Sequence, residues 1–338
     1  MSNRGKINWL LILQGWAMLW VVIGHSFIGS LDNKAEWPAY ERILMDVAYS
    51  FHMPLFMLVS GWLFYLTRLK LNELESNGGG YKWPYKSIVW DKTIRLLLPG
   101  LVFSLLAFAV KIAFPGEVSR QTGFSFREFT MAFVYPYDNP FREMWFIVTL
   151  YIFFLLAPLW QFALKHNWTK WALVVILVLL HFFHPETKFL SLDKICSHAI
   201  WFYLGLLVSK EDYVEKLMGK KPWLTILIGL IIYLLGWYID SFIITVGGIV
   251  FSFGLALVAD KYIPKLFFTF RDYTYQIFLM GIFAQMFVKI LYRHVSMPDI
   301  VAYLLCILLG LYVPVVISKI IEKINWKPLS LCVGLKTK

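Results

Sequence analysis

Two polar side chains interrupt the first long apolar run of the chain, Gln14 and His25. Eleven positions separate them, so in a helix they share one face and lie about 16 Å apart along its axis. An imidazole with an ordinary pKa of about 6.5 is able to take a proton at neutral pH. His25 is therefore a candidate general base. The alternative is a histidine that is merely hydrogen-bonded where the apolar run ends.

A second apolar run carries His52 inside the segment Phe51-His52-Met53-Pro54-Leu55-Phe56, and Ser60-Gly61 follows two turns later. Pro54 removes a backbone donor and kinks a helix. Irregular backbone of this kind needs protein or water around it. The alternative is structural, with a packing kink at His52 and a helix–helix contact at the small residues Ser60 and Gly61.

Charged residues stand at the beginnings of two later apolar runs. Lys92 and Arg95 are one helical turn apart, and two cations on one face could hold a phosphate. Their alternative role is to anchor the chain at the cytoplasmic side. Glu143 precedes Met144-Trp145-Phe146 and could orient a histidine or bind a sugar hydroxyl. Its alternative is a solvated carboxylate.

Three further histidines, His181, His184 and His198, lie close together in the sequence. No acidic residue or cysteine stands at ligand spacing from them, so we expect no metal site and interpret them as interfacial. Asp46 is interpreted as a residue near a helix start.

The composition identifies the elements that must position these residues. Hydrophobic residues make up 59% of the 338 and charged residues only 16%, against about 25% charged in soluble chains. This composition therefore indicates a polytopic membrane protein. Its net charge of +11 needs no nucleic acid as partner, because cytoplasmic loops of membrane proteins collect Lys and Arg.

A span needs about 20 apolar residues, and the sequence offers ten candidates. They cover about residues 8–28, 43–66, 93–114, 144–164, 171–184, 197–209, 223–240, 242–259, 274–293 and 300–321. The fifth and sixth are short, and the seventh and eighth are separated by almost nothing, around Asp240-Ser241. We predict an all-α fold of about ten transmembrane helices.

The distribution of Lys and Arg sets the orientation. With the N-terminus inside and ten spans, 22 of the 32 fall on the cytoplasmic side, 8 fall outside, and Lys111 and Lys289 fall near span ends. This split places both termini in the cytoplasm. We predict one transmembrane domain over residues 1–325 and a short basic cytoplasmic tail over 326–338. The longest outer loop, 115–143, is rich in aromatic residues and proline.

Four of these segments together resemble acyltransferase family 3, the integral-membrane acyltransferases that modify glycans. They are Ile7-Asn8-Trp9-Leu10 through Gln14 to Gly24-His25-Ser26, then Phe51-His52-Met53-Pro54-Leu55-Phe56 with Ser60-Gly61, then Lys92-Thr93-Ile94-Arg95 to Pro99, and Met144-Trp145-Phe146-Ile147. The second is similar to the family segment almost residue for residue. The strong matches cover roughly residues 7–100 and 142–160.

The resemblance implies an enzyme that transfers an acyl group, most often acetyl, from acyl-CoA to a sugar hydroxyl, with His25 as general base. His52, Ser60 or Gln14 would supply a donor to the oxyanion, and Glu143 would orient His25 or the acceptor. Lys92 and Arg95 would hold the phosphates of acetyl-CoA or another acyl-CoA, with no metal needed. The acceptor would be a cell-surface or lipid-linked glycan, and the location a bacterial inner membrane.

One position departs from the family, which usually carries Arg at the place of Gln14. Gln keeps hydrogen bonding but loses the charge, so the charge must come from elsewhere, with Lys92 and Arg95 as candidates. Two other classes stay open. One is a transporter or flippase for glycolipids or polysaccharide precursors, although no repeated halves are visible. The other is a non-catalytic member of the family.

Overall fold

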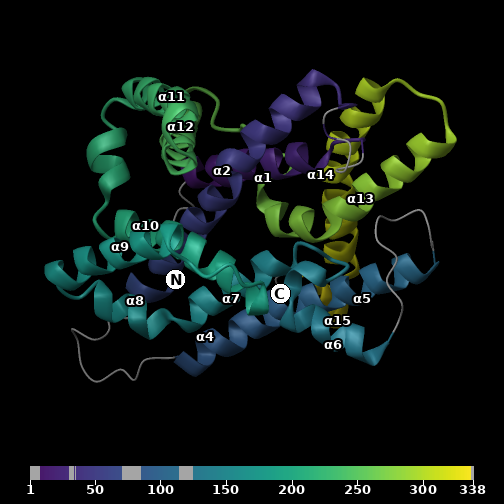
Figure 1. Cartoon of the computed structure of the whole chain (residues 1–338), viewed down its shortest axis with the longest axis horizontal. Coiled ribbons are helices and arrows are strands. Elements are labelled where there is room, and N and C mark those ends of the chain that lie inside the picture. The colour runs from purple at the N-terminus through teal and green to yellow at the C-terminus, as the bar shows by residue number, and fades with distance from the viewer. Residues whose placement is uncertain (1–7, 30–33, 35, 71–84, 114–124, 336–338) are drawn as a thin grey trace. The chain divides into compact units, whose positions relative to one another are not determined.

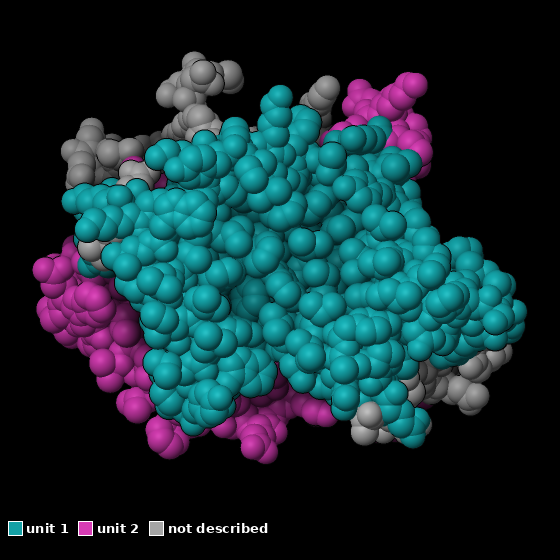
Figure 2. All heavy atoms as spheres, turned by 90° about the horizontal axis from the view of Figure 1, so that it is seen from above, with its two compact units in different colours: residues 1–59, 211–319 teal, residues 60–210, 320–338 magenta. Residues whose placement is uncertain are grey.

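The computed structural model describes residues 8–29, 34, 36–70, 85–113 and 125–335, which form helices and no strand. The predicted all-α fold is therefore confirmed. Residues 1–7, residues 71–84 between the second and third predicted spans, residues 115–124 of the predicted outer loop 115–143 and the last three residues of the predicted tail lie outside the described residues. The chain divides into two compact units, one of residues 1–59 with 211–319 and the other of 60–210 with 320–338 (Figure 2). The single domain over 1–325 stays a prediction.

Seven helical stretches among the described residues are long and apolar enough to cross a membrane. An eighth arises if α7 (Met144–Leu155) and α8 (Ala157–Ala163), which meet at 55°, count as one span. The two short predicted spans correspond to α9 (Asn167–Phe182) and α10 (Leu192–Lys210). The membrane-protein class is confirmed, whereas the number ten is not.

Unit 1 contains α1 (Asn8–His25), most of α2 (Ala39–Phe64) and the helices between residues 211 and 319. These are η6 (Val214–Met218), α11 (Pro222–Ile239), α12 (Ser241–Tyr262), η7 (Arg271–Tyr273), α13 (Thr274–His294) and α14 (Asp299–Ile324), the last as far as Lys319 (Figure 1). Helix α1 packs against α12 and α13.

Helices α11 and α12 lie side by side (Figure 1) because glycines let their backbones touch. A Cβ atom on Gly229 would overlap the backbone of Phe251, and one on Gly247 would overlap that of Tyr233. Small residues at such a seam are the usual means of helix association in a membrane. Asp240 caps α12 by accepting a hydrogen bond from the amide of Phe242 at 2.7 Å, which confirms the short junction expected there.

Pro54 stands inside α2, where its missing N–H leaves the carbonyl of Ser50 without the usual helical partner. The Thr245 hydroxyl of α12 donates to that carbonyl at 2.7 Å. A hydroxyl from a neighbouring helix thus supplies the hydrogen bond that Pro54 cannot donate, and backbone carbonyls inside a membrane need such a partner.

Unit 2 contains the end of α2 with η2 (Tyr65–Leu69), α4 (Tyr85–Lys92), η3 (Thr93–Leu97), α5 (Leu98–Ala113) and α6 (Phe126–Val134), followed by η4 (Pro136–Asp138), α7 to α9, η5 (Phe189–Ser191) and α10. Its core is aromatic and fully buried, with Phe64, Phe153, Trp160, Phe202 and Tyr203. The predicted tail holds α15 (Lys327–Cys332), which packs against α5.

Candidate functional site

The two candidate histidines of unit 1 contact the same tyrosine ring. His25 is the last residue of α1, and its ring centroid lies 5.8 Å from that of Tyr49 on α2. The Tyr49 ring lies 5.1 Å from that of His52 and perpendicular to it. Gly24 makes this approach possible, because a Cβ there would already come within 3.1 Å of the Ala48 Cβ. The structure therefore brings His25 and His52 together around Tyr49.

His52 is almost completely buried, with 1% of its surface exposed. Its Nδ1 lies 2.5 Å from the carbonyl oxygen of Ala48, one turn earlier in α2. A carbonyl only accepts, so Nδ1 carries the proton and Nε2 is the nitrogen that accepts in the neutral ring. This arrangement fixes the ring, while the catalytic role of His52 stays a prediction.

Two residues of α13 hold the end of α1 that carries His25. Lys289 Nζ donates to the carbonyl oxygen of His25 at 3.0 Å and lies 4.0 Å from the centroid of the Phe27 ring. Gln285 donates from its amide nitrogen to the carbonyl of Val22 and to the hydroxyl of Ser26, each at 2.9 Å. A cation at a helix C-terminus is also attracted by the partial negative charge that the helix dipole places there.

The segment after His25 is held by a buried carboxylate, Glu41, of which 1% is exposed. Glu41 accepts from the amide of Ile28 at 3.0 Å and from the hydroxyl of Tyr40 at 3.4 Å. Sequence reasoning missed Glu41 and Gln285, and it counted Lys289 only as a charge near a span end. A carboxylate in the first turn of an apolar helix was the available signal for Glu41.

Gln14 is half-buried on α1, which is one continuous helix from Asn8 to His25. The expected geometry of Gln14 and His25 on one face therefore holds. The neighbouring turns fit closely into unit 1, since the indole of Trp16 donates to Ser252 Oγ at 3.0 Å and a Cβ on Gly15 would press against Phe267. The role of Gln14 in binding the acyl donor stays a prediction.

In unit 2, Lys92 and Arg95 belong to a cluster built around the carboxylate of Asp91. Arg95 Nε lies 2.8 Å from Asp91 Oδ1, and Arg68 of η2 lies 2.9 Å from Asp91 Oδ2. Lys92 turns elsewhere, with its Nζ 3.8 Å from the ring centroid of Phe154, a cation–π contact. Three cations against one anion leave this cluster positive. Arg68 was not singled out as a candidate from the sequence.

Ser60 and Glu143 also lie in unit 2, on different elements. Ser60 is half-buried beside Gly61, where a Cβ would overlap the carbonyl oxygen of Phe202 on α10. This is the helix–helix contact that the structural alternative for Ser60 expected. Glu143 is the half-buried N-cap residue of α7, where a carboxylate is favoured by the helix dipole. Their roles toward substrate stay predictions.

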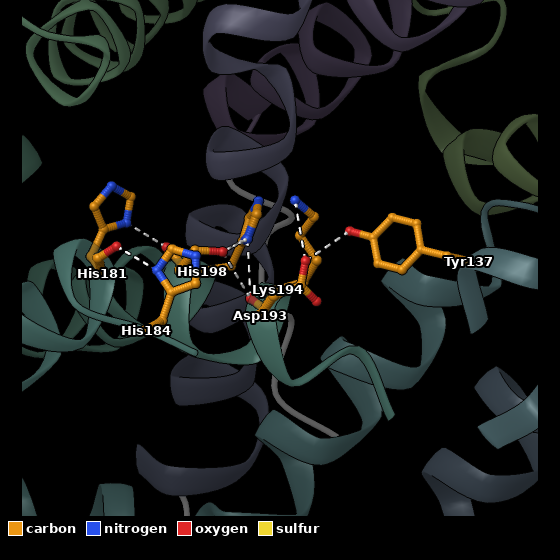
Figure 3. A network of polar contacts seen from close by, with 7 residues as sticks. Tyr137, His181, His184, Asp193, Lys194 and His198 are labelled. Carbon is orange, nitrogen blue, oxygen red and sulfur yellow. Dashed lines mark hydrogen bonds and ion pairs between the residues drawn. The ribbon is translucent and has the colours of Figure 1, made fainter. Parts of the chain in front are cut away.

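The remaining histidines are joined through the ends of α9 and α10 (Figure 3). His181 Nδ1 binds the carbonyl of Ser197 at 2.6 Å, His184 Nδ1 binds that of His181 at 2.8 Å, and His198 Nδ1 binds that of Lys194 at 3.1 Å. Asp46 pairs with Lys34 at 2.6 Å on the surface.

Apolar helices of spanning length with a few fixed histidines and cations among them define an integral-membrane protein with a polar site. The sequence model of acyltransferase family 3, an acyltransferase domain, matches residues 7–319. The chain therefore belongs to acyltransferase family 3, and it is a membrane acyltransferase. No curated protein matches the chain. No solved structure matches it either.

Proposed function

We propose that this enzyme transfers an acyl group, acetyl in the first instance, from acyl-CoA to a hydroxyl of a cell-surface or lipid-linked glycan. One observation supports it above the others. His25 ends a membrane helix, its ring lies against Tyr49, and Lys289 binds its carbonyl oxygen. A histidine held in this way has the fixed position that a general base needs.

The proposed step begins when a ring nitrogen of His25 takes the proton of the acceptor hydroxyl. The oxygen attacks the thioester carbonyl, forming a C–O bond and a tetrahedral oxyanion. The C–S bond then breaks, and the thiolate of CoA leaves and recovers the proton from His25. The products are an ester and free CoA. Proton transfer of this kind contributes typically about 10²–10⁴ in rate.

The oxyanion requires hydrogen-bond donors near the reacting carbonyl. Gln14 and Ser60 remain the proposed donors, and Gln14 is half-buried on the same helix as His25. His52 would donate from Nε2 only as an imidazolium, because the single N–H of its neutral ring is committed to the Ala48 carbonyl. Glu143 is proposed to orient the acceptor.

The donor is proposed to bind at the cations around Asp91. Arg68 and Arg95 each keep guanidinium nitrogens beyond those that pair with Asp91, and Arg95 is half-exposed. Guanidinium groups bind phosphate oxygens in two-pronged fashion. Lys92 contributes a third charge. Arg68 therefore joins the predicted Lys92 and Arg95 as a group for the phosphates of CoA.

We place the enzyme in a bacterial inner membrane, with acyl-CoA in the cytoplasm and the acceptor glycan outside. The decisive experiment is mass spectrometry of surface glycans, before and after mild alkali, which hydrolyses O-acyl esters. The strains are wild type, a deletion, and the deletion complemented with His25→Ala or with His294→Ala. His294 is an exposed residue at the end of α13 and serves as the matched control.

We expect an alkali-labile acyl mass in wild type and His294→Ala that is missing from the deletion and from His25→Ala. If His25→Ala keeps the mass while the deletion loses it, His25 is not the base. If the deletion strain also keeps the alkali-labile acyl mass, acyl transfer to surface glycans is refuted and the transporter or non-catalytic alternative is favoured. Release of free CoA by the purified protein provides the independent biochemical test.

A further inference from the structure

Unit 2 contains a second polar cluster, which has no part in the proposed acyl transfer or in the proposed binding of acyl-CoA. It lies where η4, η5 and the beginnings of α7 and α10 meet. Figure 3 shows the Tyr137 hydroxyl pointing at the Asp193 carboxylate, with the Lys194 side chain beside it. We call it the Asp193 cluster. Its members are Tyr137, Trp145, Ser191, Asp193, Lys194 and His198.

Flat aromatic faces form one part of the cluster. The rings of Tyr137 and Trp145 are parallel within 2°, with centroids 6.1 Å apart. The Trp145 ring also lies 5.6 Å from that of His198, and Lys194 Nζ lies 5.7 Å from the centroid of the Tyr137 ring. An aromatic face is negative, so it attracts the weakly positive C–H groups of a ligand.

Asp193 provides one carboxylate oxygen that no described residue uses as an acceptor. Its Oδ2 accepts from the Tyr137 hydroxyl at 3.5 Å and lies 3.6 Å from Lys194 Nζ. Its Oδ1 is buried and has no hydrogen-bond partner among the described residues. Burial also raises the pKa of Asp193, which precedes the predicted span of 197–209. A buried oxygen without a partner is costly, and a bound ligand hydroxyl would satisfy it.

The backbone leading into Asp193 is strained in a way that supports a functional role. Leu190 and Ser191 both have positive φ, 47° and 58°, although neither is glycine. Ser191 is fully buried, and its hydroxyl likewise has no partner in the described part of the chain. Strain of this kind persists where the surrounding structure holds it, and it clusters at binding sites. Two unsatisfied oxygens thus lie within three residues of a strained turn.

His198 adds a further hydrogen-bonding group next to the aromatic faces. Its Nδ1 is occupied by the Lys194 carbonyl at 3.1 Å and the Ser197 hydroxyl at 2.9 Å. A carbonyl partner requires the proton on Nδ1, so Nε2 is the acceptor in the neutral ring. The cluster therefore combines aromatic faces, hydroxyl-binding oxygens and nitrogens, and one ammonium group.

This combination matches one ligand class, a sugar ring, which has C–H groups on its faces and hydroxyls around its edge. We propose that the Asp193 cluster binds a sugar ring of the acceptor glycan, with Trp145 against one ring face and Asp193 and Lys194 on the hydroxyls. The inference rests on the proposed function, because it takes the acceptor to be a glycan. The predicted topology puts this end of α7, α9 and α10 outside, where such a glycan is met.

The test measures sugar binding directly, on the purified full-length protein in detergent. The probe is the surface glycan of the deletion strain, cut to oligosaccharides by mild acid, de-esterified with alkali and fluorescently labelled. Fluorescence anisotropy gives its Kd for wild type, Trp145→Ala, Trp145→Phe, Asp193→Asn and Trp168→Ala. Trp168 is 71% exposed at the start of α9 and serves as the control.

We expect Kd to rise at least about tenfold for Trp145→Ala and Asp193→Asn, and less than about threefold for Trp145→Phe, which keeps an aromatic face. Trp168→Ala should bind like wild type. Unchanged Kd in Trp145→Ala and Asp193→Asn, or no binding by wild type, overturns the proposal. If Asp193→Asn is not monodisperse, Lys194→Gln, on a half-exposed side chain, carries the same expectation.

CoA release in the presence of the same oligosaccharides separates this inference from the proposed function. Transfer by wild type with unchanged sugar binding in the variants would refute the Asp193 cluster and leave the enzyme assignment intact. Binding that is lost in the variants, without any transfer by wild type, would leave the sugar site and refute the proposed reaction. His25→Ala should bind the probe normally and transfer nothing.

Discussion

Replacing Lys289 with Met tests how the position of His25 is maintained. Lys289 Nζ donates to the His25 carbonyl oxygen at 3.0 Å and lies over the Phe27 ring at 4.0 Å. Met keeps most of the apolar length of the side chain and removes the ammonium. The carbonyl at the end of α1 then loses its charged donor, while the imidazole itself is unchanged.

The size of the effect follows from these two contacts. A hydrogen bond from a charged donor is worth about 1.5–3 kcal/mol, and a cation–π contact adds about 0.5–2 kcal/mol. We expect the variant to lose about 2–5 kcal/mol of stability in this part of unit 1. A displacement of about 1 Å at a catalytic group can cost about 10²-fold in rate, so kcat should fall between about 10- and 100-fold. Lys289→Arg keeps a cationic donor and should lose much less.

The assay follows CoA release by purified enzyme with saturating acetyl-CoA and de-esterified glycan fragments, together with the Tm of each variant. The His25 reasoning predicts a lower kcat with unchanged KM for acetyl-CoA, and partial rescue by Lys289→Arg. A Lys289→Met variant with kcat within twofold of wild type would refute it. If Lys289→Met and Lys289→Arg lose kcat equally, the length of the side chain matters instead of its charge.

Other changes have equally defined outcomes. Thr245→Val removes the donor to the half-buried Ser50 carbonyl and should lower stability by about 0.5–1.5 kcal/mol; an unchanged Tm in detergent would contradict this. Arg68→Gln should raise KM for acetyl-CoA about tenfold with little change in kcat, and a selective loss of kcat would argue against a phosphate role. Gly247→Val should block the α11–α12 seam, so a folded, fully active variant would show that the helices can separate there. Because burial raises the pKa of Asp193, its carboxylate gains a proton at a higher pH than a free aspartate does, whose pKa is about 3.9. Binding of the labelled glycan should therefore weaken as the pH falls, before a free aspartate would be protonated, and Asp193→Asn should lack that change.

Local patterns in the sequence predicted much of the fold. The apolar run ending at His25 predicted α1, and the Asp240-Ser241 junction predicted the tight connection between α11 and α12. These features depend on neighbouring residues and on apolar length, which a sequence displays directly. The short runs at α9 and α10 were harder, because a helix of 16 residues fits either a partial span or a buried helix.

Contacts between distant residues could not be predicted in the same way. Lys289 and His25 are 264 positions apart, and Thr245 and Ser50 are 195 apart. The sequence showed that Pro54 would leave a carbonyl without its partner, but it gave no means of choosing the hydroxyl that replaces it. The Asp193 cluster was hidden for the same reason, since Tyr137 and Asp193 come from segments 56 positions apart.

The replacement of the usual arginine by Gln14 gains a physical meaning from these distant contacts. A charge on α1 would have stood on the same helix as His25, about 16 Å along its axis. In this chain the described cation nearest to the His25 backbone comes instead from α13, as Lys289. If the family arginine and Lys289 serve the same electrostatic purpose, restoring Arg at position 14 should rescue part of the kcat lost in Lys289→Met. If they serve separate purposes, with the arginine acting on the donor, Gln14→Arg should lower KM for acetyl-CoA and leave the Lys289→Met defect in kcat unchanged.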